Sequence, residues 1–156
     1  MQNMKDLEEM REIHTVRRLK PGDLDRVVVI DTLLTGRPRR GYFEHKLATN
    51  LLDSTIEASL AVDIDRRLVG YLLVRVWTGE FGVSEPVAVL DTIGVHPSFQ
   101  GKGIGEALVQ QLATNLRGLN VATIRTEVNW NDFGLLRFFH SAGFKPAQRL
   151  CLDLSL

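Results

Sequence analysis

The chain has 156 residues, which is enough for one domain with a single hydrophobic core. Its 19 basic and 19 acidic residues balance, so net charge gives no general attraction to nucleic acid or to an anionic membrane. The single cysteine, Cys151, excludes an intramolecular disulfide, and no Cys/His cluster has the spacing of a metal site. Residues 1–12 lack the apolar stretch of a signal peptide, and no apolar run could span a bilayer. We therefore expect a flexible or helical extension over residues 1–12 and one cytoplasmic domain over residues 13–156.

The first half of the chain predicts one strand, two helices and a β-hairpin. Helical spacing of apolar residues follows a plausible cap at Asp23 and ends at Gly36. The turn Asp65-Arg66-Arg67 separates two apolar runs that are typical of an antiparallel hairpin. The expected strands cover residues 13–19, 57–64 and 68–77, and the expected helices cover residues 24–35 and 42–52.

The second half predicts alternating strands and helices. The nearly continuous apolar run over residues 87–95 is typical of a strand buried on both faces. A helix over 104–116, a strand over 121–128, a helix over 131–142 and a last strand over 149–154 follow. A strand, a helix and a strand in succession imply a parallel pair with a right-handed crossover. We therefore expect a mixed α/β sheet covered by helices.

A glycine-rich loop joins the strand that ends at residue 95 to the next helix. Glycines at 101, 103 and 105 allow a sharp turn and a close approach of backbone amides to an anion at the helix N-terminus. The loop is not a nucleoside-triphosphate loop, because no Ser or Thr follows Lys102. Its glycine spacing also differs from the dinucleotide fingerprint G-x-G-x-x-G. By itself, the pattern is also consistent with a tight turn that binds nothing.

Two stretches give the sequence a family resemblance. Gln100, Gly103 and Gly105 match the central motif of the GCN5-related N-acetyltransferase (GNAT) superfamily, and the helix that ends in Gly143-Phe144 is similar to the final helix of that family. The resemblance implies a mixed, mostly antiparallel sheet of six to seven strands with about four helices and a central splayed parallel pair. It also implies acetyl-CoA as the acyl donor, without a metal ion.

The resemblance further implies a set of cofactor-binding residues. The backbone of the strand before the loop would bind the pantetheine arm, the loop would hold the pyrophosphate, and the start of the last helix would contact the pantetheine. An ungapped count places Asp132 at that last position, so Asn131 is expected to cap the helix. The full expected set is Ile93, Gly94, Val95, Gln100, Gly101, Lys102, Gly103, Ile104, Gly105, Asn131, Asp132 and Phe139.

Two carboxylates are candidates for the base that deprotonates an acceptor amine. Asp91 lies within an apolar run, where a carboxylate is costly unless it is paired or functional. Its position resembles that of an acidic residue in glucosamine-phosphate acetyltransferases; the alternative is a carboxylate held by backbone amides or an arginine. Glu127 matches the glutamate of ribosomal-protein N-terminal acetyltransferases; the alternative is a solvated charge at a strand end.

Phe139 departs from the family pattern. The family's general acid is a tyrosine four residues before the glycine of the Gly-Phe ending, and phenylalanine cannot donate a proton to the leaving thiolate. Tyr42, Tyr71 and His140 are the other donors considered, and water is the remaining source. The departure also permits a non-catalytic acyl-CoA sensor or interaction module.

The expected function is transfer of an acetyl group from acetyl-CoA to a primary amine of a small molecule or peptide. Because no cysteine lies near the site motifs, we expect direct attack in a ternary complex rather than a covalent acyl-enzyme. The basic loop with Arg37, Arg39 and Arg40 indicates either a solvated charge run or a carboxylate-bearing acceptor. No nucleic-acid or membrane partner is expected, and the resemblance suggests a homodimer. A structural α/β domain whose loop binds nothing is the remaining alternative.

Overall fold

The computed structural model describes residues 15–52 and 58–156 of the chain. The residues form two compact units that divide between Thr126 and Glu127. The expected extension over residues 1–12 lies outside the described residues. Within the described ranges, no helix is both long and apolar enough to cross a lipid bilayer.

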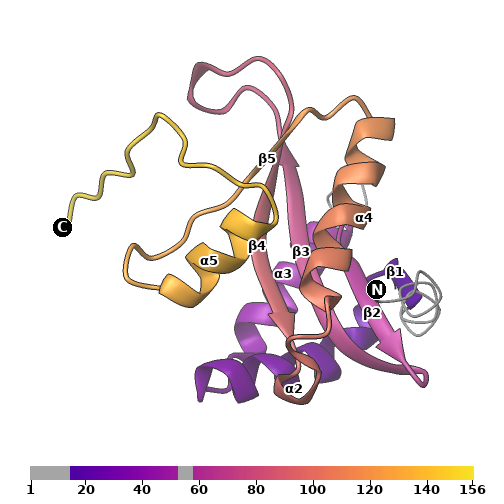
Figure 1. Cartoon of the computed structure of the whole chain (residues 1–156). Helices are drawn as coiled ribbons and strands as arrows, with labels where there is room; N and C mark the ends of the chain where they lie inside the picture. Colours follow the sequence, from indigo (N-terminus) through magenta and orange to yellow (C-terminus); the bar gives the residue numbers. More distant parts are fainter. Residues whose placement is uncertain (1–14, 53–57) are drawn as a thin grey trace, which may run out of the picture. The chain divides into compact units, whose positions relative to one another are not determined.

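The first unit is built on one sheet whose strands lie in chain order (Figure 1). Neighbouring strands from the first to the fourth are antiparallel, and the fourth and fifth are parallel. The expected mixed sheet, with its hairpin and its parallel pair, is therefore confirmed. The strands in the described residues are β1 (Thr15–Arg18), β2 (Leu60–Ile64), β3 (Arg67–Trp77), β4 (Val87–Val95) and β5 (Thr123–Arg125).

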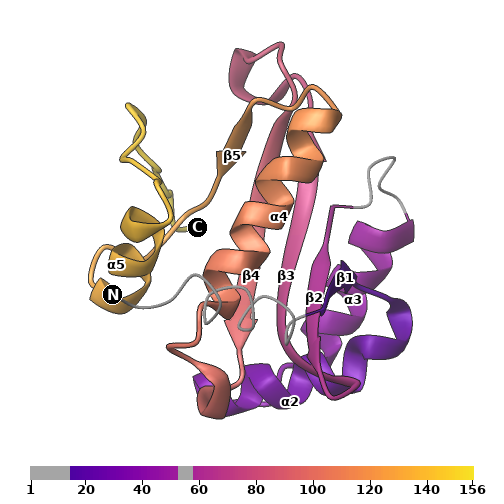
Figure 2. The same cartoon turned by 45° about the vertical axis from the view of Figure 1, so that its right-hand side comes forward.

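Helices cover both faces of this sheet, with α2 (Leu24–Thr35) and α3 (Arg40–Leu52) on one face and α4 (Ile104–Gly118) on the other (Figure 2). Alternation along β3 explains the two layers. Tyr71 is buried in one cluster with Ile30 of α2 and Phe43 of α3. Its neighbour Gly70 faces α4 instead, because a Cβ there would lie 2.8 Å from Ile104 Cγ2.

The expected six to seven strands are wrong by one or more, since the described residues form five. The predicted strand over residues 149–154 is not formed. Leu150, Leu152 and Leu154 do alternate with polar residues, but each is at least 85% exposed. Alternation indicates an extended backbone, whereas a strand also needs a partner for its hydrogen bonds and a surface for its apolar side chains. The strand expected over 121–128 is also shorter, because only Thr123–Arg125 pairs.

The second unit, residues 127–156, contains the helix α5 (Phe133–Ser141). Asp132 caps this helix, since its side chain accepts a hydrogen bond from the Leu135 amide at 3.0 Å. The expectation that Asn131 is the cap is therefore wrong by one residue: the carboxylate three positions before Leu135 has the reach that capping requires. Gly143 follows α5 with a left-handed φ of 91°, as expected of a residue that ends a helix.

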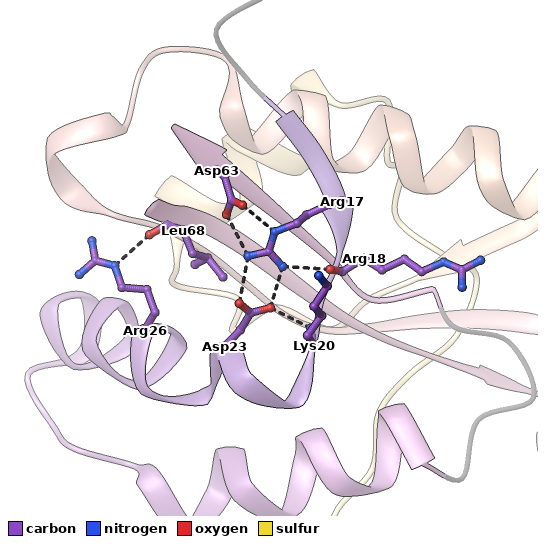
Figure 3. Close-up of polar contacts among 7 residues, drawn as sticks. All are labelled: Arg17, Arg18, Lys20, Asp23, Arg26, Asp63 and Leu68. Carbon is purple, nitrogen blue, oxygen red and sulfur yellow. Dashed lines mark hydrogen bonds and ion pairs between the residues drawn. The ribbon is translucent and has the colours of Figure 1, made fainter. Parts of the chain in front are cut away.

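Arg17 joins β1 to β2 and to the turn before α2 (Figure 3). Its guanidinium donates hydrogen bonds to Asp63 at 2.6 and 3.0 Å and to Asp23 at 2.8 and 2.9 Å. The Lys20 backbone amide also donates to Asp23, at 2.8 Å. Burial by itself would raise the pKa of Asp23, but the hydrogen bonds from Arg17 and Lys20 outweigh it and hold that pKa below its ordinary value.

Acid should therefore weaken the first unit through Asp23. Because the folded-state pKa is lowered, the pairing contributes stability above the unfolded-state pKa of about 4 and loses it as the pH falls through the folded-state value. We expect Asp23→Asn to lower the free energy of unfolding by about 1–2 kcal/mol at neutral pH and by progressively less toward pH ~3. Urea titrations across this range test it, with Asp65→Asn, an exposed turn carboxylate, as the control. If the loss of unfolding free energy in Asp23→Asn were the same at every pH, the stabilising role of the ionised Asp23 carboxylate would be contradicted.

Candidate functional site

Strand β4 separates from its parallel partner partway along its length. Its first three residues pair with β5, and Thr126 Oγ1 then donates a hydrogen bond to the Leu90 carbonyl oxygen at 2.9 Å. Beyond this point β4 continues to Val95, and no strand of the described residues pairs with it on that edge. The three residues predicted to bind pantetheine through their backbone all lie on this open stretch; they are Ile93, Gly94 and Val95.

The Tyr71 ring leaves no room for a side chain at Gly94. A Cβ at this position would lie 2.8 Å from Tyr71 Cε1 and 2.9 Å from the Tyr71 hydroxyl oxygen. Gly94 is regularly paired, and the β-bulge of β4 lies elsewhere: the register between β3 and β4 shifts where Leu73 pairs with Thr92 and Val74 with Leu90, so the extra residue is Asp91. Gly94 therefore allows the site strand to pass over a buried tyrosine.

Substituting Gly94 by alanine should destabilise the first unit by about 1–3 kcal/mol, because the fully buried Tyr71 ring cannot move away without displacing the core. Thermal or urea unfolding measures this. Gly41→Ala is the matched control, since nothing lies within 4 Å of a Cβ at that position on α3. The control should be neutral or slightly stabilising. If the two variants were equally stable, the close packing of Gly94 on the Tyr71 ring would be contradicted.

The glycine loop leads from β4 to the N-terminus of α4. Gly101 and Gly103 adopt left-handed φ values of 73° and 76°, a conformation that other L-residues rarely take. Gly103 is the cap position of α4, and within residues 15–52 and 58–156 no side chain caps this helix. Its first-turn amides therefore point away from the helix without a side-chain acceptor, and the helix dipole adds positive potential there. This geometry suits an anion such as a pyrophosphate.

The other loop residues expected at the cofactor differ in their surroundings. The Gln100 side chain donates a hydrogen bond to the Val95 carbonyl oxygen at 3.1 Å and so connects the loop to the end of β4. Lys102 is exposed, with its Nζ 5.1 Å from the centre of the Phe99 ring. Ile104 and Gly105 are buried in the first turn of α4. Only the backbone of these last two residues is placed to meet a ligand.

Asp91 is the extra residue of the β-bulge in β4. A bulge re-aims the side chains beside it, and here two consecutive residues both contact α3. Asp91 accepts a hydrogen bond from Lys46 Nζ at 2.7 Å, and the Thr92 hydroxyl lies 3.4 Å from the Tyr42 hydroxyl. The strand carboxylate is thus held by a lysine, rather than by the backbone amides or arginine considered from sequence.

Lys46 and Tyr42 form one face of α3 beside Asp91. The Lys46 Nζ lies 5.8 Å from the centre of the Tyr42 ring, within the range of a cation–π contact. The side chains of Lys46 and Asp91 are 22% and 19% exposed, so water reaches the pair but does not surround it. A carboxylate and an aromatic ring thus both contact this ammonium group, which is a suitable environment for an amine.

Arg39 and Arg40, at the start of α3, are paired within the protein. Arg39 donates to both oxygens of the buried Asp31, at 2.5 and 3.0 Å, and this bidentate contact raises the pKa of Arg39 above its ordinary value. Arg40 pairs with Asp25 and Glu44. These partners remove the support that Arg39 and Arg40 gave to a carboxylate-bearing acceptor.

The remaining predicted residues lie in the second unit. Glu127 is exposed and follows β5 without belonging to a strand. Asp132 uses its carboxylate as the α5 cap. Phe139 is 5% exposed and packs edge-on against Phe144, with ring centres 4.9 Å apart. Phe139 therefore acts as the apolar core of this unit, where the family pattern has a tyrosine.

The alternative proton donors differ in accessibility. Tyr71 is fully buried, and burial raises the pKa of its phenol well above its ordinary value, which makes it a poor acid. Tyr42 is 38% exposed and lies beside Asp91 and Thr92. His140 is exposed in the last turn of α5. Of the three, Tyr42 is the donor in the first unit that both reaches solvent and lies at the carboxylate.

Sequence reasoning did not identify Lys46 as a site residue. Its spacing from Tyr42 is i, i+4, so a helix places both on one face, and that signal was present. The spacing does not reveal which strand the face meets. The bulge that turns Asp91 toward α3 left no signal in the sequence, because it arises from the pairing of β3 with β4.

Comparisons with known proteins agree with this architecture. The sequence model of the acetyltransferase (GNAT) family matches residues 28–144, which is more than half of the chain. A [ribosomal protein bS18]-alanine N-acetyltransferase of Escherichia coli (strain K12) is 35% identical over 60 residues, or 38% of this chain and 40% of that relative. The match thus spans less than half the length of the curated relative.

Two solved structures have the same fold at low identity. A ribosomal-protein-alanine N-acetyltransferase from Brucella melitensis biovar Abortus 2308 is 19% identical with a TM-score of 0.72, over 92% of this chain and 99% of that one. An aminoglycoside N-acetyltransferase in complex with CoA is 14% identical with a TM-score of 0.74, over 91% of this chain and 94% of that one. The family match and the shared fold lead to one conclusion: the chain belongs to the acetyltransferase (GNAT) family.

Proposed function

We propose that the protein transfers the acetyl group of acetyl-CoA to a primary amine by direct attack within a ternary complex. One observation carries the proposal: the open edge of β4 leads through two left-handed glycines, the second of which is the cap residue of α4 and offers that helix no capping side chain. This combination offers backbone hydrogen bonds to an amide-containing arm and an anion site at its end. Family membership supports acetyl-CoA as a ligand of that shape.

The topology indicates how the donor would lie. With its pyrophosphate at residues 101–105, the arm would run back along β4 past Val95, Gly94 and Ile93. Its thioester end would then approach Asp91, about 13 Å from Val95 at the usual rise of a strand. When bound, acetyl-CoA supplies an acetyl group activated as a thioester. Asp91 would thus lie at the expected reaction centre, and we assign it the role of base, with Glu127 as the alternative to be tested.

Asp91 would accept a proton from the acceptor ammonium, and the neutral nitrogen would then bond to the carbonyl carbon as the carbon–sulfur bond breaks. The leaving thiolate would take a proton from water or from Tyr42, since Phe139 has none to give. The identity of the amine is open to both classes named by the relatives, an alanine of a ribosomal protein and an aminoglycoside.

Release of free thiol from acetyl-CoA tests the proposal against a panel of peptides, aminoglycosides and simple diamines. We expect turnover with at least one of these classes. The competing sensor function, favoured by Phe139, predicts coenzyme A binding by calorimetry without thiol release on any amine. Absence of coenzyme A binding would reject both functions and favour a structural domain.

A further inference from the structure

Lys46 presents a primary amine of the protein itself at the candidate base. Its Nζ donates a hydrogen bond to Asp91 Oδ2 at 2.7 Å and lies 5.8 Å from the centre of the Tyr42 ring. The Tyr42 hydroxyl in turn lies 3.4 Å from the Thr92 hydroxyl. The Lys46 ammonium therefore occupies the position at Asp91 that an external amine would have to take.

We propose that Lys46 is a self-acetylation site of this protein. The proposal rests on the proposed function, because it uses the same donor and the same base. Asp91 directly precedes the open edge of β4, so a thioester that approaches Asp91 also approaches Lys46 Nζ. Lys46 and Asp91 belong to the same unit, since α3 packs on the sheet that contains β4. The reaction therefore needs no second protein molecule.

The chemistry uses only groups already named. The Lys46 ammonium gives one proton to the Asp91 carboxylate, and the nitrogen lone pair forms a bond to the thioester carbonyl carbon while the carbon–sulfur bond breaks. The second proton lost from nitrogen ends on the leaving thiolate, and Asp91 returns its proton to solvent. The products are an acetyl amide at Lys46, free coenzyme A and one proton.

Acetylation would also change the site. The amide has no charge, so the ion pair with Asp91 is lost and the carboxylate is released for an external amine. An external amine otherwise has to displace Lys46 from Asp91. The modified protein should therefore turn over external amines without the competition that Lys46 provides.

Peptide mass spectrometry after incubation of the full chain with acetyl-CoA tests the proposal. We expect one acetyl group on Lys46, formed at a first-order rate that does not depend on protein concentration. Lys20, an exposed lysine of the same unit that lies outside the proposed site, reports chemical acetylation by the donor and should react at least about tenfold more slowly. Asp91→Asn should slow Lys46 modification by a similar factor, and Gly103→Glu should reduce it to the Lys20 level.

A second measurement needs no donor. Competitive labelling of the free protein with a small amine-reactive reagent should show Lys46 less reactive than Lys20, because Asp91 holds the Lys46 ammonium, and Asp91→Asn should remove this protection. Unmodified Lys46 in a protein that acetylates added amines overturns the self-acetylation proposal and leaves the proposed function intact. If neither Lys46 nor any amine is acetylated although coenzyme A binds, both fail.

Discussion

Replacing Gly103 by glutamate should raise the dissociation constant for coenzyme A at least about 100-fold, which corresponds to roughly 2.7 kcal/mol. Gly103 occupies the cap position of α4 with a left-handed backbone, directly at the proposed pyrophosphate site. A carboxylate there would face the anion, and two like charges about 4 Å apart near a protein surface repel by roughly 4 kcal/mol. The electrostatic term alone is thus large enough for the expected loss. Isothermal calorimetry with coenzyme A measures it.

The control separates charge from backbone strain. Gly103→Asn keeps a residue that tolerates the left-handed region and adds no charge, so it should weaken binding far less than glutamate does. Thermal melting of each variant without ligand establishes that the first unit is folded. If Gly103→Glu binds coenzyme A as tightly as the natural sequence, the phosphate site is not at this loop.

Asp91→Asn should lower kcat/KM for the acceptor by about 10²–10⁴, the usual contribution of a positioned base. Asparagine keeps the shape of the side chain but cannot accept the proton, and it also breaks the ion pair with Lys46. The affinity for coenzyme A should stay the same, because the arm is assigned to backbone groups of the following residues. Thiol-release kinetics and calorimetry on the same variant measure the two quantities.

Two further variants test whether the loss of activity is specific to Asp91. Glu127→Gln tests the other carboxylate predicted from sequence and should retain most activity if Asp91 is the base. Asp65→Asn changes an exposed carboxylate in the β2–β3 turn and should have no effect on turnover. Full activity of Asp91→Asn combined with inactivity of Glu127→Gln would transfer the role of base to Glu127, and full activity of both would exclude both.

The sequence alone determined the features that local pattern controls. Local sequence patterns located α2, α3, α4 and α5, with apolar periodicity as the signal for α2 and α4, and a continuous apolar run located β4 with the bounds that the structure has. The sharp turn at Gly101 and Gly103 could be predicted because a left-handed backbone conformation favours glycine wherever it occurs. Because the motif is contiguous along the chain, its residues needed no distant partner to be recognised.

Tertiary structure decided the features that depend on a partner far along the chain. Leu150, Leu152 and Leu154 have the alternation of a strand, yet no strand forms there, because alternation supplies neither backbone partners nor a surface to cover. The ion pair that holds Asp91 joins residues 45 positions apart, and a bulge in the β3–β4 register brings them together. Residue type suggested that Asp91 matters, but only the packing of α3 on the sheet revealed that a lysine already occupies its side of the site.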